Sequence, residues 1–325
     1  MRHLLADRPA DPVGASAADQ RGLRGPTGQE WLDELPALIE HALDRWELRP
    51  DGEARHGECA LVLPVVGRSP RGPVRAAQAA LKLTWPHAEA RHEHLALRAW
   101  GGRGAVELLA ADPARWTLLL ERLDAERELS GIPILEACEE IGGLMLLLDR
   151  PALPQCDLVA DKAVRWADQL ARGTPLVPRR LTEQAAGTLA DLLASAPEPR
   201  LVHEDLHDLN VLAPLADQGE PREGRRAGAW VAIDPKPVSG EWAYAVAPIV
   251  WNRADETSRA SSLRTHARLR ADLVAEAAGL DPDRVQAWTL VRLVLNAVWA
   301  ADYAPFSDEF RGRMIALAKA FTDAG

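Results

Sequence analysis

The sequence predicts an α+β fold of two lobes, a small lobe rich in β-strands followed by a larger helical lobe. Residues 59–66 and 79–83 are apolar, strand-like runs separated by a turn rich in Gly, Pro and Ser. Beyond residue 124, apolar residues recur at helical spacing in long segments separated by Pro-containing turns. A chain of 325 residues is also long enough to build two sizeable cores.

Composition and periodicity divide the chain into three parts. Residues 1–26 lack apolar periodicity and are expected to be disordered. Residues 27–124 are predicted to form the β-rich lobe and residues 125–325 the helical lobe. The first lobe opens at Thr27-Gly-Gln-Glu30, which has capping-box spacing and starts an amphipathic helix that Pro36 is expected to kink or restart.

The remaining elements follow from local patterns. The small lobe should continue with a helix over 87–100 and strands at 105–109 and 116–123, and leave through the polar residues 124–128. In the larger lobe, the loops at 201–212 and 229–237 read as short strands between helices. Those helices are predicted at Ile134–Leu148, Asp157–Ala171, Leu181–Ala196, Ser258–Gly279, Asp281–Asp302 and Phe306–Asp323.

Charge and cysteine content limit the classes of function. The 38 Lys and Arg against 48 Asp and Glu give a net charge of −10, which argues against nucleic-acid binding and mildly favours a cationic or neutral small ligand. The three widely spaced cysteines fit a reducing compartment. Because the chain shows no signal core and no bilayer-length apolar run, we expect a cytoplasmic protein without a membrane partner. The sequence leaves the oligomeric state open.

Two short loops of the second lobe carry the residue types of a phosphoryl-transfer site. Asp205 follows the apolar pair Leu201-Val202, Asn210 stands five residues later, and Asp234 follows the apolar run 231–233. Phosphoryl transfer needs one carboxylate to accept the proton of the acceptor hydroxyl. It also needs oxygen ligands for the magnesium that bridges the nucleotide phosphates. These three residues therefore predict a kinase.

The first loop also matches a zinc-protease pattern, because residues 203–207 read H-E-x-x-H. A zinc site requires both histidines on one helix and a third ligand nearby. The downstream acids Glu220 and Glu223 lie in a turn-like segment, and zinc leaves Ile233-Asp-Pro-Lys236 unexplained. The kinase interpretation is favoured over zinc and over a purely structural loop.

Lys82 is the predicted phosphate-binding cation of the small lobe. Only four residues of the chain are Lys, and Lys82 stands inside an apolar strand, from which its ammonium can reach a phosphate oxygen. The preceding hairpin would cover the phosphates, although it lacks G-x-G-x-x-G and an ordinary surface hairpin is the alternative. Of the two acids on the next helix, Glu93 is preferred to Glu89 as the partner of Lys82, because apolar residues beside it pack that helix on the sheet. In the alternative, both acids are solvated.

From about residue 25 to its end, the chain resembles the aminoglycoside phosphotransferase family, most closely its streptomycin-kinase and hydroxyurea-phosphotransferase branch. The resemblance rests on residues 202–212, on Ala232-Ile-Asp-Pro-Lys-Pro237, and on the hinge-like Leu119-Leu-Glu-Arg-Leu123. It implies a bilobal protein-kinase-like fold that uses ATP and Mg²⁺. The roles that it implies are a base at Asp205, magnesium ligands at Asn210 and Asp234, phosphate ordering by Lys82 with Glu93, and nucleotide contacts at Glu121 and Leu123.

Two positions depart from the common pattern of that family. Glu204 stands where Gly is usual, and Ala245 where an acid is usual. A buried Glu204 would raise the pKa of Asp205, whereas an exposed one would not. Three hypotheses follow: a kinase that phosphorylates a hydroxyl of an antibiotic, a housekeeping sugar or metabolite kinase, and a catalytically weak nucleotide-binding protein.

The acceptor is expected to be a hydroxylated small molecule, and we predict a cationic aminocyclitol or amino sugar. Aromatic faces and paired polar groups of the second lobe suit such a ligand. As alternatives, the tryptophans belong to the core and the acids are exposed surface charges. The candidate residues are Asp208, Trp251, Asn252, Trp288, Asn296 and Asp302.

Overall fold

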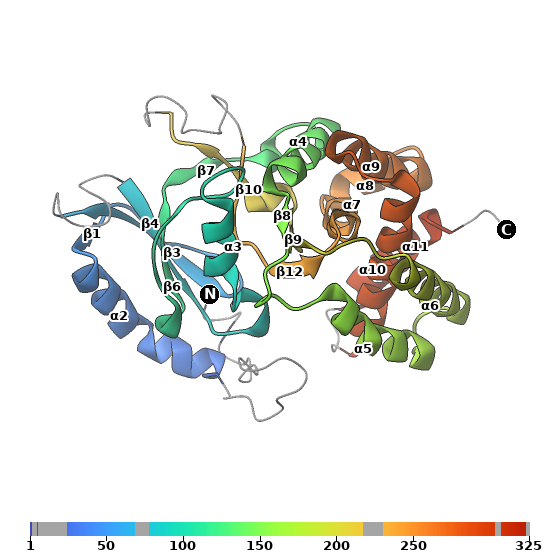
Figure 1. Ribbon diagram of the computed structural model, residues 1–325, viewed down its shortest axis with the longest axis horizontal. Helices are drawn as coiled ribbons and strands as arrows, with labels where there is room; N and C mark the ends of the chain where they lie inside the picture. Colours follow the sequence, from blue (N-terminus) through green and yellow to red (C-terminus); the bar gives the residue numbers. More distant parts are fainter. Residues whose placement is uncertain (2–4, 6–24, 69–77, 217–229, 303–306, 323–325) are drawn as a thin grey trace. The chain divides into compact units, whose positions relative to one another are not determined.

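The computed structural model describes residues 1, 5, 25–68, 78–216, 230–302 and 307–322 (Figure 1). Two compact units form, one from residues 1–126 with 212–236 and one from residues 127–211 with 237–325. The first contains most of the β-structure and the second most of the helices, which confirms the predicted α+β class. Most of the segment 1–26 and of the turn at 67–73, and both Glu220 and Glu223, lie outside the described residues.

The first helix whose bounds the structure describes is α2 (Gly28–Arg45), which begins as predicted. The Thr27 hydroxyl accepts a hydrogen bond from the Glu30 amide (3.2 Å), and the Thr27 amide donates to the Glu30 carboxylate (2.8 Å), which completes a capping box. Pro36 lies inside this helix. Of the two outcomes expected at Pro36, a restart of the helix is wrong, and a kink stays a prediction.

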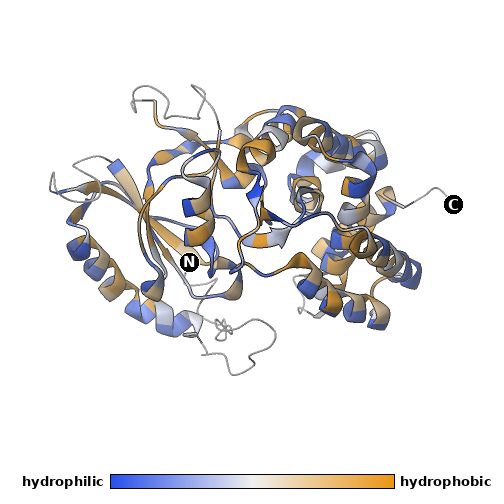
Figure 2. Cartoon of the chain, viewed as in Figure 1, coloured by the Kyte–Doolittle hydropathy of each residue, from blue (hydrophilic) through white to orange (hydrophobic). Residues whose placement is uncertain are grey.

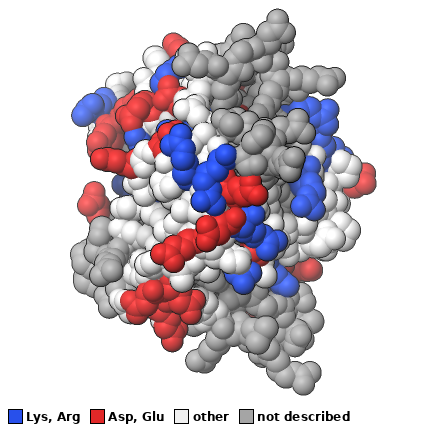
Figure 3. Space-filling model, turned by 90° about the vertical axis from the view of Figure 1, so that its left-hand side faces the viewer, with Lys and Arg blue, Asp and Glu red and all other residues white. Residues whose placement is uncertain are grey.

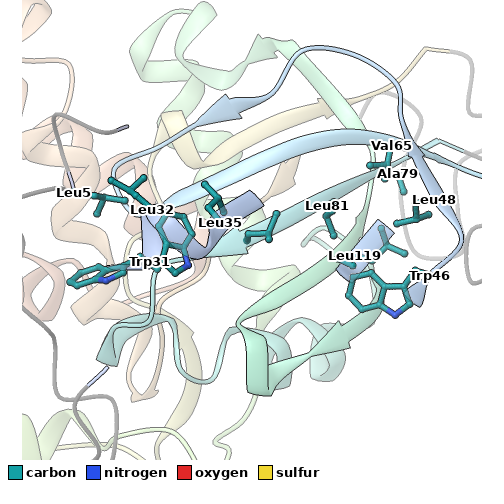
Figure 4. Close-up of a cluster of buried hydrophobic side chains, with 13 residues drawn as sticks. Leu5, Trp31, Leu32, Leu35, Trp46, Leu48, Val65, Ala79, Leu81 and Leu119 are labelled. Atoms are coloured by element: carbon teal, nitrogen blue, oxygen red, sulfur yellow. The ribbon is translucent and has the colours of Figure 1, made fainter. Parts of the chain in front are cut away.

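The main sheet of this unit is antiparallel, in the order β1-β3-β4-β6-β5 with β2 beside β3. Side chains alternate across β4, so that Ala79, Leu81 and Leu83 join the core under α2 together with Trp31 (Figure 4). Lys82 therefore points to the other face. The strands are β1 (Leu48–Pro50), β2 (Arg55–His56), β3 (Ala60–Gly67), β4 (Gln78–Thr84), β5 (Leu108–Asp112) and β6 (Thr117–Glu121).

The helix expected over 87–100 is shorter than predicted. Residues Ala88–Ala90 form a 3₁₀ turn, η1, and the α-helix α3 covers only Glu93–Trp100. Figure 1 shows α2 and α3 on opposite sides of the sheet. Glu93 therefore opens the helix that covers the Lys82 face.

A second, small sheet explains why residues 212–236 belong to the first unit. Its strands are β7 (Leu123–Glu128), β10 (Val211–Pro214) and β11 (Val231–Ala232), in the order β11-β10-β7. The Val106 amide also donates to the carbonyl of Ala232 (2.9 Å). Residues 124–128, expected only as a polar exit, pair through their backbone, since ladder hydrogen bonds do not depend on the side chains.

The second unit is mainly helical. The long helix α10 (Pro282–Asp302) packs against most of the other helices, and α4 (Ile134–Leu148) packs on α9 (Leu263–Ala278). The other helices are α5 (Val159–Arg172), α6 (Arg179–Ala194), α7 (Ala247–Trp251), α8 (Ala254–Arg259) and α11 (Ser307–Ala320). In Figure 2, α5 and α6 carry both hydrophilic and hydrophobic residues, as amphipathic helices do.

A sheet of three short strands supports the loop with Asp205. Its order is β12-β9-β8, where β8 is Arg150–Pro151, β9 is Arg200–His203 and β12 is Pro237–Gly240. β9 is buried between its two neighbours and ends at His203, immediately before the loop.

Among the described residues, no helix is both long and apolar enough to cross a membrane. On the face of the first unit shown in Figure 3, Lys and Arg side chains alternate with Asp and Glu instead of forming one broad basic surface.

Candidate active site

In the first unit, Lys82 lies between two acids. Its side chain is buried, and Nζ donates to Glu93 (2.6 Å) and forms an ion pair with Asp234. Burial opposes the charge of Lys82, but the carboxylates of Asp234 and Glu93 outweigh it and raise the pKa of the ammonium. Lys82 is therefore charged at neutral pH, as a phosphate-binding group must be. Glu89, the other acid considered from the sequence, pairs with Lys236 at 3.4 Å.

Asp234 stands two residues after β11, where the backbone leaves the small sheet. Its φ of +53° is in the left-handed region, which Asp tolerates better than most residues. Half of its side-chain surface is exposed although it contacts the buried Lys82. The carboxylate is therefore anchored at one end and accessible to a cation.

The two residues predicted to contact the nucleotide, Glu121 and Leu123, lie at the junction of β6 and β7. Glu121 is buried, and its carboxylate accepts the amide of Glu107 at 2.9 Å. Leu123 begins β7 and is also buried. The Glu121 side chain thus binds the residue that precedes β5, and its predicted contact with a nucleotide would have to come from its backbone.

In the second unit, hydrogen bonds define the loop between β9 and β10. The Asp205 amide donates to Nδ1 of His203 (3.3 Å), and Nδ2 of Asn210 donates to the Asp205 carbonyl (2.9 Å). This second bond uses the nitrogen of the Asn210 amide, and not the oxygen that the predicted magnesium site requires. Asn210 is the last residue of the 3₁₀ turn η4 (Asp208–Asn210).

The zinc interpretation fails on the same geometry. His203 ends β9 and His207 caps η4, so the two histidines do not lie one turn apart on a helix. Within the described ranges, no group of three His, Cys, Asp or Glu is placed to hold a metal ion.

Glu204 is neither exposed nor unpaired. Only 12% of its side chain is exposed, and Lys162 binds both carboxylate oxygens, at 3.0 and 2.7 Å. The Tyr244 hydroxyl donates to the same carboxylate, and Arg292 stacks over the Tyr244 ring at 4.4 Å. Burial would raise the pKa of Glu204, but Lys162, then Arg292, and the hydrogen bonds lower it. The negative charge beside Asp205 is thus neutralised.

Sequence reasoning did not find Lys162, Tyr244 or Arg292. They lie on α5, on the 3₁₀ turn η5 (Trp242–Val246) and on α10, 40 or more residues from Glu204 along the chain. One signal was available, since Lys162 is one of only four lysines.

Asp208 fits neither the acceptor site nor the alternative of an exposed surface charge. It is fully buried, so it is no surface charge. Neither of its oxygens has a hydrogen-bond partner among the described residues, and the nearest cation is Nε of Arg253 at 3.9 Å. Burial raises its pKa. We therefore leave Asp208 out of the acceptor site proposed below.

The other acceptor candidates differ in accessibility. Trp288 is almost fully buried and packs edge-on against Tyr244 at 5.3 Å, so it belongs to the core. The Asn252 side chain donates to the carbonyl of Pro248 (2.9 Å). Trp251 is half-buried beneath Arg292, and Asn296 is half-buried on α10. Asp302 ends α10, and its side chain lies outside the described residues.

The sequence matches a family model described as aminoglycoside/hydroxyurea antibiotic resistance kinase over residues 45–304. The chain belongs to this family. It is 36% identical over 295 residues to a streptomycin 6-kinase of Streptomyces glaucescens, covering 89% of each chain. It is 38% identical over 288 residues to a hydroxyurea phosphotransferase of Kitasatospora aureofaciens, covering 86% of this chain and 76% of that one.

Solved structures agree on the fold of this kinase. A choline/ethanolamine kinase family protein from Mesorhizobium loti superposes with a TM-score of 0.61 at 13% identity, covering 88% of this chain and 95% of that chain. The choline kinase LicA from Streptococcus pneumoniae gives 0.53 at 10% identity, covering 89% and 99%. At such identities the similarity establishes the protein-kinase-like fold alone.

Proposed function

We propose that this kinase transfers the γ-phosphate of ATP to a hydroxyl of an aminoglycoside-like antibiotic of the streptomycin type, and so confers resistance in the cytoplasm. The observation that carries the proposal is the loop around Asp205, where hydrogen bonds hold the backbone on both sides of one partly exposed carboxylate. The relatives named streptomycin 6-kinase support the acceptor class. Nucleotide use is supported by LicA, whose structure is described in complex with AMP.

In this proposal, Asp205 accepts the proton of the acceptor hydroxyl as its oxygen attacks the γ-phosphorus, and ADP leaves. Lys82, held by Glu93, binds the nucleotide phosphates. The donors at Asn210 and Asp234 are an amide oxygen and a carboxylate, the hard ligands that Mg²⁺ prefers. When bound, magnesium would neutralise charge on the phosphates.

We propose a cationic acceptor because the chain is acidic and because Trp251 and Asn296 remain partly accessible in the second unit. A sugar or metabolite kinase and a weak nucleotide-binding protein are the alternatives. A panel of streptomycin, hydroxyurea, choline and neutral sugars, each incubated with Mg·ATP and assayed for ADP release and phosphorylated product, separates the three.

Substituting the proposed base tests the mechanism. With the best acceptor, Asp205→Ala should lower kcat by about 10²–10⁴-fold and leave ATP affinity largely intact, because proton transfer is lost and the phosphate-binding groups are not. Asp191→Asn, at an exposed position of α6, is the control and should match the wild type. Near-wild-type turnover by Asp205→Ala would remove Asp205 from the mechanism.

A further inference from the structure

The Glu204 cluster, which comprises Glu204, Lys162, Tyr244 and Arg292, joins three separate elements of the second unit to the loop that carries Asp205. Lys162 comes from α5, Tyr244 from η5 and Arg292 from α10. The exposed fractions of the charged side chains are 12% for Glu204, 19% for Lys162 and 12% for Arg292. A buried carboxylate is tolerated only when paired, so the cluster depends on all of its members.

Arg292 connects this cluster to the backbone of the loop. Its Nη1 donates to the carbonyl oxygens of Glu204 (3.1 Å) and Tyr244 (3.2 Å). Its guanidinium lies over two aromatic rings, with Cζ 4.4 Å from the centroid of Tyr244 and 5.0 Å from that of Trp251. A planar guanidinium that is stacked and hydrogen-bonded has little rotational freedom. Arg292 therefore fixes two carbonyl groups on different segments of the chain.

The carbonyl of Glu204 belongs to the peptide group that joins Glu204 to Asp205. The next peptide group begins with the Asp205 carbonyl, which Asn210 binds at 2.9 Å. The peptide groups on both sides of Asp205 are thus held, one by Arg292 and one by Asn210. Because these two peptide planes set the direction of the Cα–Cβ bond of Asp205, they set where its carboxylate can lie.

We infer that Glu204, Lys162 and Arg292 are positioning residues that fix the orientation of the Asp205 carboxylate, an inference that rests on the proposed function. Glu204 acts through charge, by holding Lys162 and Arg292 against the loop, and not by contact with a substrate. The cluster also replaces the support for the loop that an acid would give at position 245, where this chain has the fully buried Ala245. The carboxylate that braces the loop comes from within the loop.

A matched pair of substitutions tests the inference. Glu204→Gln removes the charge with little change of shape. The control, Glu241→Gln, removes the charge of another buried acid. Glu241 pairs with Arg284 (2.7 Å), which lies on α10 as Arg292 does. Among the described contacts, Glu241 has no hydrogen bond to residues 203–210. Misplacing a catalytic group by about 1 Å costs on the order of 10²-fold in rate. We therefore expect Glu204→Gln to lower kcat by about 10–100-fold with the KM for ATP unchanged, and Glu241→Gln to keep the wild-type kcat.

A second pair covers the case in which Glu204→Gln does not fold. Arg292→Lys keeps the positive charge but loses the planar guanidinium that stacks on Tyr244 and Trp251, and Arg284→Lys is its control on α10. Arg292→Lys should reproduce the selective loss of kcat, whereas Arg284→Lys should not. Equal kcat values within each pair, measured well below the melting temperatures of all four variants, would overturn the inference.

Hydrogen exchange separates this inference from the proposed function, since it requires no turnover. Relative to the amides of α9 in the same protein, the amides of residues 203–210 should exchange about 10-fold faster in Glu204→Gln and in Arg292→Lys than in the wild type and the two controls. If the wild type phosphorylates no acceptor, the proposed function fails and the exchange rates still decide whether the cluster holds the loop. Unchanged exchange in both variants would refute the positioning role.

Discussion

At the scale of single residues, the ionised Glu204 makes stability depend on pH. Its pKa is lowered in the folded protein from an ordinary value of 4.5. A lowered carboxyl pKa contributes stability that is fully present above the unfolded value and is lost as the pH falls through the folded value. The Glu204 pairs should therefore stabilise the protein at pH 7 and contribute little in strong acid.

The corresponding prediction concerns Glu204→Gln. At pH 7 we expect it to lose about 3 kcal/mol of unfolding free energy, because Lys162 and Arg292 keep their charges in a buried environment without the acid. The difference from the wild type should shrink as the pH falls below about 4.5. Thermal melts of both proteins from pH 7 to pH 3.5 measure it, and a difference that stays constant over this range would show that Glu204 is not ionised in the folded state.

Single residues also show what the sequence could and could not predict at the site. The proximity of Lys82 and Glu93 follows from alternation along one strand and from the helix next in sequence, which are local rules. The burial of Asp208 and the partners of Glu204 do not follow from local rules. They depend on how α5, η5 and α10 pack, and no spacing in the chain reveals that packing.

At the scale of elements, the contact of α4 with α9 depends on a missing side chain. A Cβ atom on Gly142 would lie 2.5 Å from Cβ of Ala277 and 2.8 Å from the carbonyl oxygen of Val274, both closer than van der Waals contact. The adjacent Gly143 has no such neighbour within 4 Å. Gly142 therefore allows the close approach of the two helices, whereas Gly143 has room for a side chain.

Alanine at each position should change stability in opposite directions. Gly142→Ala should lose about 1–3 kcal/mol, because the two helices must separate to admit the methyl group. Gly143→Ala should gain roughly 0.5–1 kcal/mol, since Ala loses less backbone entropy than Gly in a helix. Melting temperatures of the two variants and the wild type check this. Equal shifts would mean that α4 and α9 do not approach each other so closely.

Long periodic segments were predicted closely in two cases, whereas the helix expected at Ser258–Gly279 is interrupted, because α8 ends at Arg259 and α9 begins at Leu263. The helix expected at Ile134–Leu148 has those bounds in the structure, and α10 differs from its prediction by one residue. Short or polar elements were predicted less well. β7 carries polar side chains and owes its existence to backbone pairing, and Pro36 is tolerated because a packed apolar face offsets the lost hydrogen bond.

At the scale of the whole molecule, nucleotide binding should increase the free energy of unfolding. A ligand that binds only the folded state stabilises it by about 2.7 kcal/mol when present at 100 times its Kd. We expect ATP with Mg²⁺ to raise the melting temperature, and ATP with EDTA to raise it much less. Asp234→Asn, which keeps the size of a proposed magnesium ligand but removes its charge, should abolish the difference between the two conditions.

The control for this measurement is Asp191→Asn, which should respond to Mg²⁺ as the wild type does. Metal analysis of the purified protein completes the test. Stoichiometric zinc that survives dialysis, together with no magnesium-dependent stabilisation by ATP, would contradict the kinase mechanism proposed here.

The assignment of residues 212–236 to the first unit affects how the protein is made. That unit contains residues 1–126, but β10 and β11 of its small sheet, together with Asp234, come from a segment that ends at residue 236. At a synthesis rate of about 5–20 residues per second, the ribosome needs roughly 5–20 s to add the intervening chain. During that interval β7 has no partner strand from this sheet to pair with. During synthesis the first unit therefore remains incomplete, because its small sheet cannot form until β10 and β11 have been translated.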